Sequence, residues 1–356
     1  MIPLMLFNKT SLKSKVAAVL TITFFFTFFG IRLNAQTHPK IAEGYTHFQT
    51  TLKKDTIDFV VAETDFKLKK PVLLFCQGSQ PVPLFFDFPD QGIIPVTLNN
   101  FDVSEMKKYY HVVVISMPKT PVTVGWDHLN KQYNYITDTT NQYSYSSEYL
   151  KSDYSENYIR RANEVLKYLS KQKWVDNNKL VIAGHSQGAR VAVGIAATNK
   201  KVSELGLFGY NPNGRIDQSI RQIRKNVEAG KISWESADSL QRDQYDFYKM
   251  IQTPDSILAH PSLISWKSFS QPTVQALTEL TIPVYIAYGS EDIVADYCDL
   301  LPLYFIEKGK KNYKVLRYPN LEHNFFPIDK NGNPDYQNGS WFVVMNSFIH
   351  WSVQIY

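Results

Sequence analysis

One pentapeptide constrains the fold of this chain more than any other segment. Residues 184–188 read GHSQG, in which Ser186 stands between two glycines with one residue on each side. The apolar residues 179–183 predict a strand before it, and the small residues 189–197 favour a helix after it. At such a sharp strand-to-helix turn, the strained serine points its hydroxyl beyond the sheet edge, and the glycines allow close backbone approach. The simpler alternative is a glycine-rich turn with an incidental serine.

Two later segments supply chemical partners for this serine. Residues 283–290 predict a buried strand that delivers Asp292, and residues 313–319 predict the next strand, which His323 follows. A serine hydroxyl is a poor nucleophile at neutral pH, and a histidine can accept its proton because imidazole titrates near pH 6.5. Asp292 would hold the imidazole in one tautomer and stabilise the imidazolium. The pattern therefore favours nucleophilic catalysis, although His323 is also compatible with an ordinary surface-loop histidine.

The order Ser186, Asp292, His323 resembles that of the α/β-hydrolase family. The resemblance covers roughly residues 45–352. It implies the α/β-hydrolase fold, with a mainly parallel sheet and helices on both faces, and a nucleophile, acid and base at these three positions. The alternation of predicted strands and helices favours the same mainly parallel sheet.

The identity of the acid has nearby alternatives. Glu291 and Asp296 flank Asp292 closely in sequence. The family also tolerates an acid after the preceding strand, but residues 210–213 read YNPN and carry no carboxylate. That absence favours Asp292.

An oxyanion hole is also needed, because a tetrahedral intermediate places negative charge on the former carbonyl oxygen. The resemblance places one donor at the backbone N–H of Gln187. It places the second after the strand predicted over 71–76, where Ser79 N–H occupies the matching position. Many family members carry His-Gly where this chain has Gln77 and Gly78. The alternative is a plain glycine turn.

The first 35 residues predict a secretory signal peptide. Three lysines lie within the first fifteen residues, an uncharged apolar run of 16 residues follows over 16–31, and residues 33–35 read LNA. We expect cleavage near this point and export to the periplasm or the exterior, with no stable membrane insertion afterwards. An uncleaved anchor is the alternative, although 16 residues fall short of the roughly 20 needed to span a bilayer.

Composition agrees with one large globular unit, because 356 residues with 44% hydrophobic content can bury a full core. The net charge of +5 arises mostly within residues 1–35, which contain four basic residues and no acidic one. The remaining chain is close to charge balance, so nothing predicts nucleic-acid binding.

Two cysteines, Cys76 and Cys298, are present. Both lie in segments predicted to be buried, so we expect two free thiols, with a disulfide as the alternative. No cysteine–histidine spacing predicts a zinc site, and no metal or cofactor is expected.

Two segments exceed what the core requires. Residues 214–280, between core segments 36–213 and 281–356, predict two helices. They resemble the cap that many α/β-hydrolases insert at this point, which would lie over Ser186; a peripheral embellishment is the alternative. Residues 120–149 are rich in tyrosine and predict either a substrate groove, including one that stacks on a sugar, or an anchored polar loop.

Two classes of function remain open. One is a serine hydrolase acting on a small ester or peptide substrate, either a carboxylester hydrolase or an aminopeptidase or acyl-peptide hydrolase. The other is a non-catalytic binding protein with the same fold. A peptidase acting on a free N-terminus needs carboxylates near Ser186, for which Glu204, Glu235 and Asp243 are candidates.

Overall fold

The computed structural model describes residues 39–330 and 332–354. The predicted signal peptide, residues 1–35, lies outside this described part. Every helix within the described part is too short or too polar to cross a membrane. The described residues all belong to one unit by their internal contacts.

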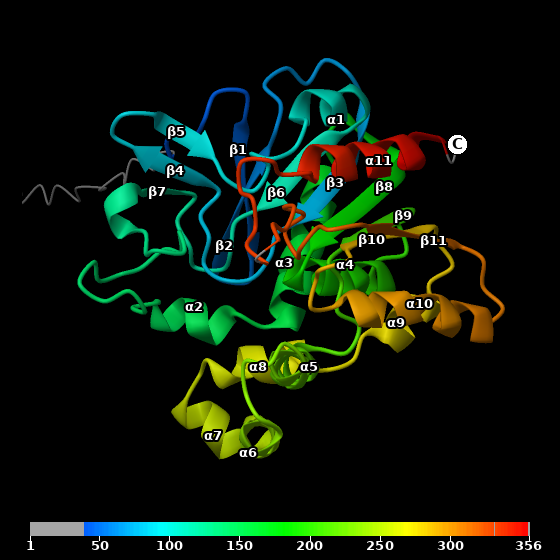
Figure 1. The fold of residues 1–356 in the computed structure, drawn as a ribbon. Coiled ribbons are helices and arrows are strands. Elements are labelled where there is room, and N and C mark those ends of the chain that lie inside the picture. Colours follow the sequence, from blue (N-terminus) through cyan, green and yellow to red (C-terminus); the bar gives the residue numbers. More distant parts are fainter. Residues whose placement is uncertain (1–38, 331, 355–356) are drawn as a thin grey trace, which may run out of the picture. The chain divides into compact units, whose positions relative to one another are not determined.

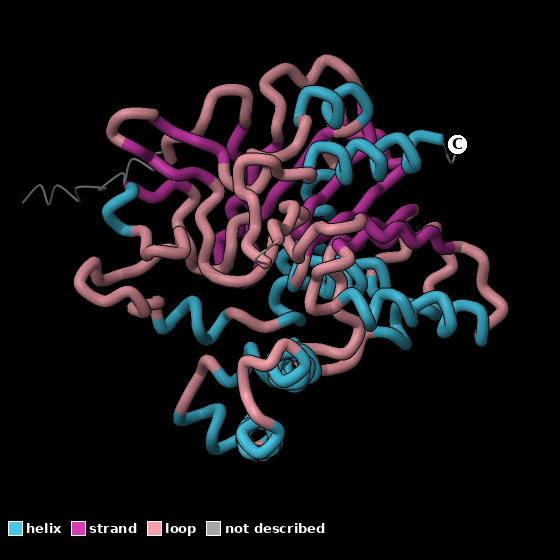
Figure 2. The backbone as a smooth tube through the Cα atoms, in the orientation of Figure 1, coloured by secondary structure: helices cyan, strands magenta, loops and turns pink. Residues whose placement is uncertain are grey.

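An eight-stranded sheet lies at the centre of this unit (Figures 1 and 2). Its order is β1-β2-β6-β3-β8-β9-β10-β11; β1 and β2 pair antiparallel, β2 joins β6 antiparallel, and all neighbours from β6 to β11 are parallel. The sheet is therefore mainly parallel, as the sequence predicts. Its strands are β1 (Thr46–Leu52), β2 (Asp55–Val61), β3 (Lys70–Cys76), β6 (His111–Ile115), β8 (Val175–His185), β9 (Glu204–Phe208), β10 (Val284–Gly289) and β11 (Tyr313–Tyr318).

Helices cover both faces of this sheet. Successive strand residues point to opposite faces, so Leu73 packs in one apolar cluster and Leu74 in another. This double burial explains why the central strands are almost continuously apolar. The Leu73 cluster includes residues of α1 (Val103–Tyr109) and α11 (Trp341–Gln354), and the Leu74 cluster includes residues of α3 (Ser155–Leu169), α4 (Gln187–Thr198), α9 (Val274–Glu279) and α10 (Ala295–Glu307).

A second, three-stranded sheet was not foreseen from the sequence. It has the order β5-β4-β7, and its strands are β4 (Phe85–Phe88), β5 (Gly92–Pro95) and β7 (Thr123–Gly125). The tyrosine-rich segment 120–149 contains β7, the short 3₁₀ helix η1 (Trp126–His128) and the start of α2 (Ser147–Ser152). The buried Asn130 and Asn134 side chains both donate to Tyr145 Oη, which favours the anchored-loop interpretation of this segment.

Four helices between β9 and α9 form the part of the chain that corresponds to the predicted cap. They are α5 (Arg215–Glu228), α6 (Trp234–Gln252), α7 (Pro254–Ala259) and α8 (Leu263–Phe269), and they lie together below the sheet in Figure 1. Ile216, Ile251 and Leu263 form a small apolar cluster of their own among these helices. In contrast, Leu277 of α9 packs in the cluster beneath the main sheet. The boundaries of the cap, residues 214–280, stay a prediction. The packing of Leu277 associates α9, which lies within these boundaries, with the core.

The turn between β8 and α4 has the strained geometry that the pentapeptide predicts. Ser186 has φ of 57° and ψ of −121°, in the positive-φ region that non-glycine residues rarely adopt. A Cβ on Gly184 would lie 2.3 Å from the Gly188 carbonyl oxygen, and one on Gly188 would lie 2.0 Å from the carbonyl oxygen of Cys76. Both glycines are therefore required by contacts with backbone, which cannot rotate away.

We expect Gly188→Ala to destabilise the fold by about 1–3 kcal/mol, because α4 must move away from the end of β3. The free energy of unfolding in urea measures this loss. Gly194→Ala is the matched control, since Gly194 lies in the same helix but its added Cβ would meet only the Ile159 side chain. Equal losses for the two variants would contradict this account.

Candidate active site

The structure brings Ser186, His323 and Asp292 into one hydrogen-bonded chain. His323 Nε2 lies 2.9 Å from Ser186 Oγ, and His323 Nδ1 lies 2.8 Å from Asp292 Oδ2. Asp292 is 1% exposed, and its other oxygen accepts the Val294 N–H at 3.0 Å. With the carboxylate as an acceptor, Nδ1 carries the proton and Nε2 is free to accept one from the serine. The three residues lie after β8, β10 and β11, at the carboxyl ends of these strands.

The rival carboxylates point elsewhere. Glu291 accepts a hydrogen bond from Ser290 Oγ, and Asp296 pairs with Arg221 of α5. Neither side chain forms a hydrogen bond or an ion pair with His323. Of the three acids near the end of β10, Asp292 alone is placed to orient the imidazole.

The two charges of this pair shift each other's pKa. Burial alone would lower the pKa of His323, but the charge and the hydrogen bond of Asp292 outweigh it, so the pKa lies above its usual value. Burial alone would raise the pKa of Asp292, and His323 outweighs it by the same two effects, so that pKa lies below its usual value. Asp292 therefore stays ionised at neutral pH and favours the imidazolium form of His323.

His185 makes a contact that the sequence analysis missed. Its Nε2 donates a hydrogen bond to the backbone carbonyl of His323 at 2.9 Å. Burial, and then the charge on His323, lower the pKa of His185 to about 3, so this ring stays neutral at neutral pH. A neutral ring holds the loop that carries His323 without adding a second charge. The sequence carries no signal for this contact, because the G-x-S-x-G motif allows any residue at the position of His185.

Gln187 and Ser79, the predicted oxyanion-hole residues, both line the cavity that contains Ser186. Gln187 begins α4, where the first N–H groups have no partner within the helix. A Cβ on Gly78 would lie 3.9 Å from Ser186 Cβ, so the loop after β3 passes beside the serine. The Gln77 side chain, where the family often has histidine, is held by Thr97 and by the Ile115 carbonyl. The backbone of this loop therefore remains suited to donate.

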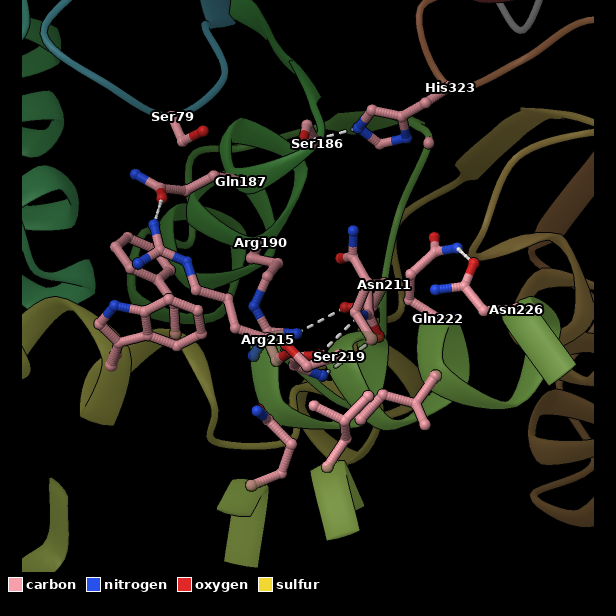
Figure 3. Close-up of a pocket in the computed structure, with 18 residues that line it drawn as sticks. Ser79, Ser186, Gln187, Arg190, Asn211, Arg215, Ser219, Gln222, Asn226 and His323 are labelled. Carbon is pink, nitrogen blue, oxygen red and sulfur yellow. Dashed lines mark hydrogen bonds between the residues drawn. The ribbon is translucent and has the colours of Figure 1, made fainter. Parts of the chain in front are cut away.

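A cavity of about 510 Å³ opens onto Ser186 and His323 (Figure 3). Much of its wall is one face of α5, because residues three and four positions apart align along a helix. These wall residues are Arg215, Gln218, Ser219, Gln222, Ile223 and Asn226. Trp266 and Phe269 of α8 complete the wall near Arg215. The helices of the predicted cap therefore contribute directly to the cavity, whereas residues 120–149 do not line it.

The lining carries positive charge and no carboxylate within the described part of the chain. It includes Arg190 and Arg215, together with several carboxamide side chains. Glu204 is buried on β9 with Lys179 Nζ at 2.7 Å, and Glu235 and Asp243 lie on α6 outside the lining. The three candidate carboxylates are therefore not assembled near Ser186.

Cys76 and Cys298 are not bonded to each other and remain free thiols. Cys298 Sγ lies 3.2 Å from the Tyr210 carbonyl oxygen. Across residues 39–330 and 332–354, no group of three or more histidine, cysteine or acidic side chains is arranged to hold a metal ion.

No protein-family model and no curated protein sequence matches this chain. Solved structures are similar at low identity. A putative dipeptidyl aminopeptidase IV from Bacteroides ovatus is 10% identical, with 87% of this chain and 35% of that chain covered and a TM-score of 0.49. A serine hydrolase involved in carbazole degradation is 13% identical, with 87% and 98% covered and a TM-score of 0.46. An acylaminoacyl peptidase from Pyrococcus horikoshii is 12% identical, with 79% and 38% covered and a TM-score of 0.46.

The chain spans only about a third of the length of the first of these proteins, 35%. The fold is identified by the chain's own strand order and by the strained serine between β8 and α4. It is the α/β-hydrolase fold, which confirms the prediction from the motif order.

We expect Asp292→Asn to lower kcat by roughly 10²–10⁴-fold without unfolding the protein, because the imidazole loses its orienting carboxylate. As the pH is raised, the residual activity should also appear at a lower pH than the activity of the unmodified protein. Asp292 holds the pKa of His323 up, so removing its charge leaves burial to lower that pKa. Measuring kcat and the pH profile of kcat/KM for a p-nitrophenyl ester tests the two effects.

Asp296→Asn is the matched control, since this carboxylate pairs with Arg221 and forms no ion pair with His323. Severe loss of activity in Asp296→Asn, with Asp292→Asn unaffected, would reverse the assignment.

Proposed function

We propose that this protein is a serine hydrolase that cleaves an ester or amide bond through an acyl-enzyme, and more specifically a carboxylester hydrolase. The observation that carries the proposal is the chain of short contacts from Ser186 Oγ through His323 to Asp292. A serine, a neutral imidazole acceptor and a buried carboxylate in this arrangement activate a hydroxyl for attack on a carbonyl carbon.

In the proposed reaction, Ser186 Oγ attacks the carbonyl carbon while its proton moves to His323 Nε2. The backbone N–H groups of Gln187 and Ser79 stabilise the resulting oxyanion. As the intermediate collapses, the bond to the leaving group breaks and His323 returns the proton to that group. A water molecule then attacks the acyl-enzyme with His323 as base, which releases the acid and restores Ser186.

The charge of the cavity favours an ester substrate over a peptide with a free N-terminus. An aminopeptidase of that kind holds a substrate ammonium with carboxylates, and the described lining has none. Arg190 and Arg215 would repel an ammonium group instead. The charge of the cavity therefore argues against an aminopeptidase. An acyl-peptide hydrolase, which does not need to bind a free ammonium group, stays open as an alternative.

Export belongs to the same proposal. The lysine-rich start and the apolar run over 16–31 support a cleaved signal peptide, after which residues from about 36 onward would act in the periplasm or outside the cell.

Ser186→Ala should lower kcat by roughly 10³–10⁶-fold and abolish covalent labelling by a fluorophosphonate, because the proposed nucleophile is missing. Hydrolysis of p-nitrophenyl acetate and mass spectrometry of the labelled protein provide the two measurements. If the unmodified protein is neither labelled nor active on a panel of esters and amino-acyl anilides, the alternative of a binding protein without catalysis is supported.

Trp266→Ala should change the relative kcat/KM values among p-nitrophenyl esters of different acyl length by roughly 10-fold or more, because pocket contacts contribute about 1–3 kcal/mol to discrimination. Trp266 lines the cavity, whereas Trp234 is 54% exposed and lies outside it. Trp234→Ala is therefore the matched control and should leave these ratios unchanged. Equal changes in both variants would indicate a general effect of the helices on the site.

A further inference from the structure

Arg215 is a cation inside the cavity that lacks a carboxylate partner. Its side chain lines the wall beside Gln187, and within the described part of the chain no acidic oxygen forms an ion pair with it. Its guanidinium lies 4.8 Å from the Phe269 ring centroid and 5.5 Å from that of Trp266. A cation kept in a partly enclosed pocket is a binding group for an anion.

A ring of hydrogen bonds fixes the position of this guanidinium. Arg215 donates through one nitrogen to Ser265 Oγ at 2.7 Å and through another to Gln187 Oε1. Ser265 Oγ then donates to Asp153 Oδ2 at 2.7 Å, and Gln187 Nε2 lies 3.5 Å from Asp153 Oδ1. An arginine carries five N–H donors, and these two bonds leave three of them for a ligand.

Arg190 has a different arrangement, although it lines the same cavity. Its two terminal nitrogens donate to the backbone carbonyls of Asn211 and Gln271, and the residue is 5% exposed. These carbonyls occupy the fork that would bind a carboxylate. Arg215 is therefore the arginine of the cavity that is available to a substrate.

The geometry also indicates which part of a substrate would meet Arg215. Figure 3 shows Ser186 between His323 on one side and Gln187 with Arg215 on the other. The leaving group must approach His323 Nε2, because it takes its proton there. The acyl group then extends toward the opposite side, along Gln187 and Arg215.

We propose that the substrate carries a carboxylate on its acyl group and that Arg215 binds this carboxylate through its free N–H donors. The proposal rests on the hydrolase function proposed above and names the substrate class for that site. One guanidinium matches one planar carboxylate, and pairing them reduces the positive charge of the cavity lining.

Two esters that differ only in this charge provide the test. They are mono(p-nitrophenyl) adipate and its terminal amide, p-nitrophenyl adipamate, which have nearly the same size. We expect kcat/KM to be roughly 10- to 100-fold higher for the carboxylate than for the amide, as a charge-assisted hydrogen-bonded pair provides. Arg215→Gln should remove this preference, and Arg215→Lys should retain part of it, since lysine keeps the charge but loses the fork.

Arg224→Gln is the matched control, because Arg224 lies on the same helix but pairs with Glu228 outside the cavity. This variant should keep the full preference. The comparison uses the ratio of two rates in each variant, so a general loss of activity does not affect it. If Arg215→Gln does not fold, inhibition of the unmodified protein provides a second test. Free adipate should then inhibit hydrolysis of a neutral ester more strongly than adipamide does.

Equal rates for the two esters in the unmodified protein would overturn the proposal, and so would a preference that survives Arg215→Gln. Labelling of Ser186 by a fluorophosphonate distinguishes a failure of the proposed substrate class from a failure of the proposed hydrolase function. A labelled protein without a carboxylate preference would refute the substrate class alone. An unlabelled and inactive protein would refute the hydrolase function itself.

Discussion

The close approach of two backbones at Gly188 is the constraint on which the site depends. The start of α4 lies so near the end of β3 that a Cβ at this residue would collide with the Cys76 carbonyl. The same approach brings the loop that carries Ser79 beside Ser186 and places the first N–H groups of α4 in the same cavity. One contact between secondary-structure elements thus positions both the proposed nucleophile and the proposed oxyanion donors, and the strained serine is the local consequence.

Gln187 links this core geometry to the helices α5–α8. Its backbone N–H is the proposed donor to the reacting carbonyl, while its side chain joins Arg215 of α5 and Asp153 before α3. The wall of the cavity is therefore fastened to the residue that follows Ser186. The apolar core of these helices is small and consists of Ile216, Ile251 and Leu263. The hydrogen bonds of Gln187 therefore help to hold α5 in a fixed position relative to Ser186.

The sequence predicts the parts of this site that depend on local pattern. The glycine spacing around Ser186 and the apolar strands before Asp292 and His323 are local features, and the observed turn and strands agree with them. The ring formed by residues 153, 187, 215 and 265 joins four distant segments, and neither periodicity nor a motif indicates that they meet. The β4–β5–β7 sheet was missed for a related reason, since its short strands of three or four residues lack a clear alternation.

The distribution of charge around Ser186 fits the proposed substrate in a second way. Attack on an acyl group that carries a carboxylate creates an oxyanion near an existing negative charge, and such like-charge repulsion raises the barrier. Pairing the carboxylate with Arg215 cancels that charge before the oxyanion forms, and the amino end of α4 favours negative charge at the carbonyl itself. His185, kept neutral by burial, adds no competing cation beside the base. In the proposed reaction the cavity thus separates two tasks, since Arg215 would hold the substrate charge and the backbone donors would remain available for the charge that develops at the carbonyl.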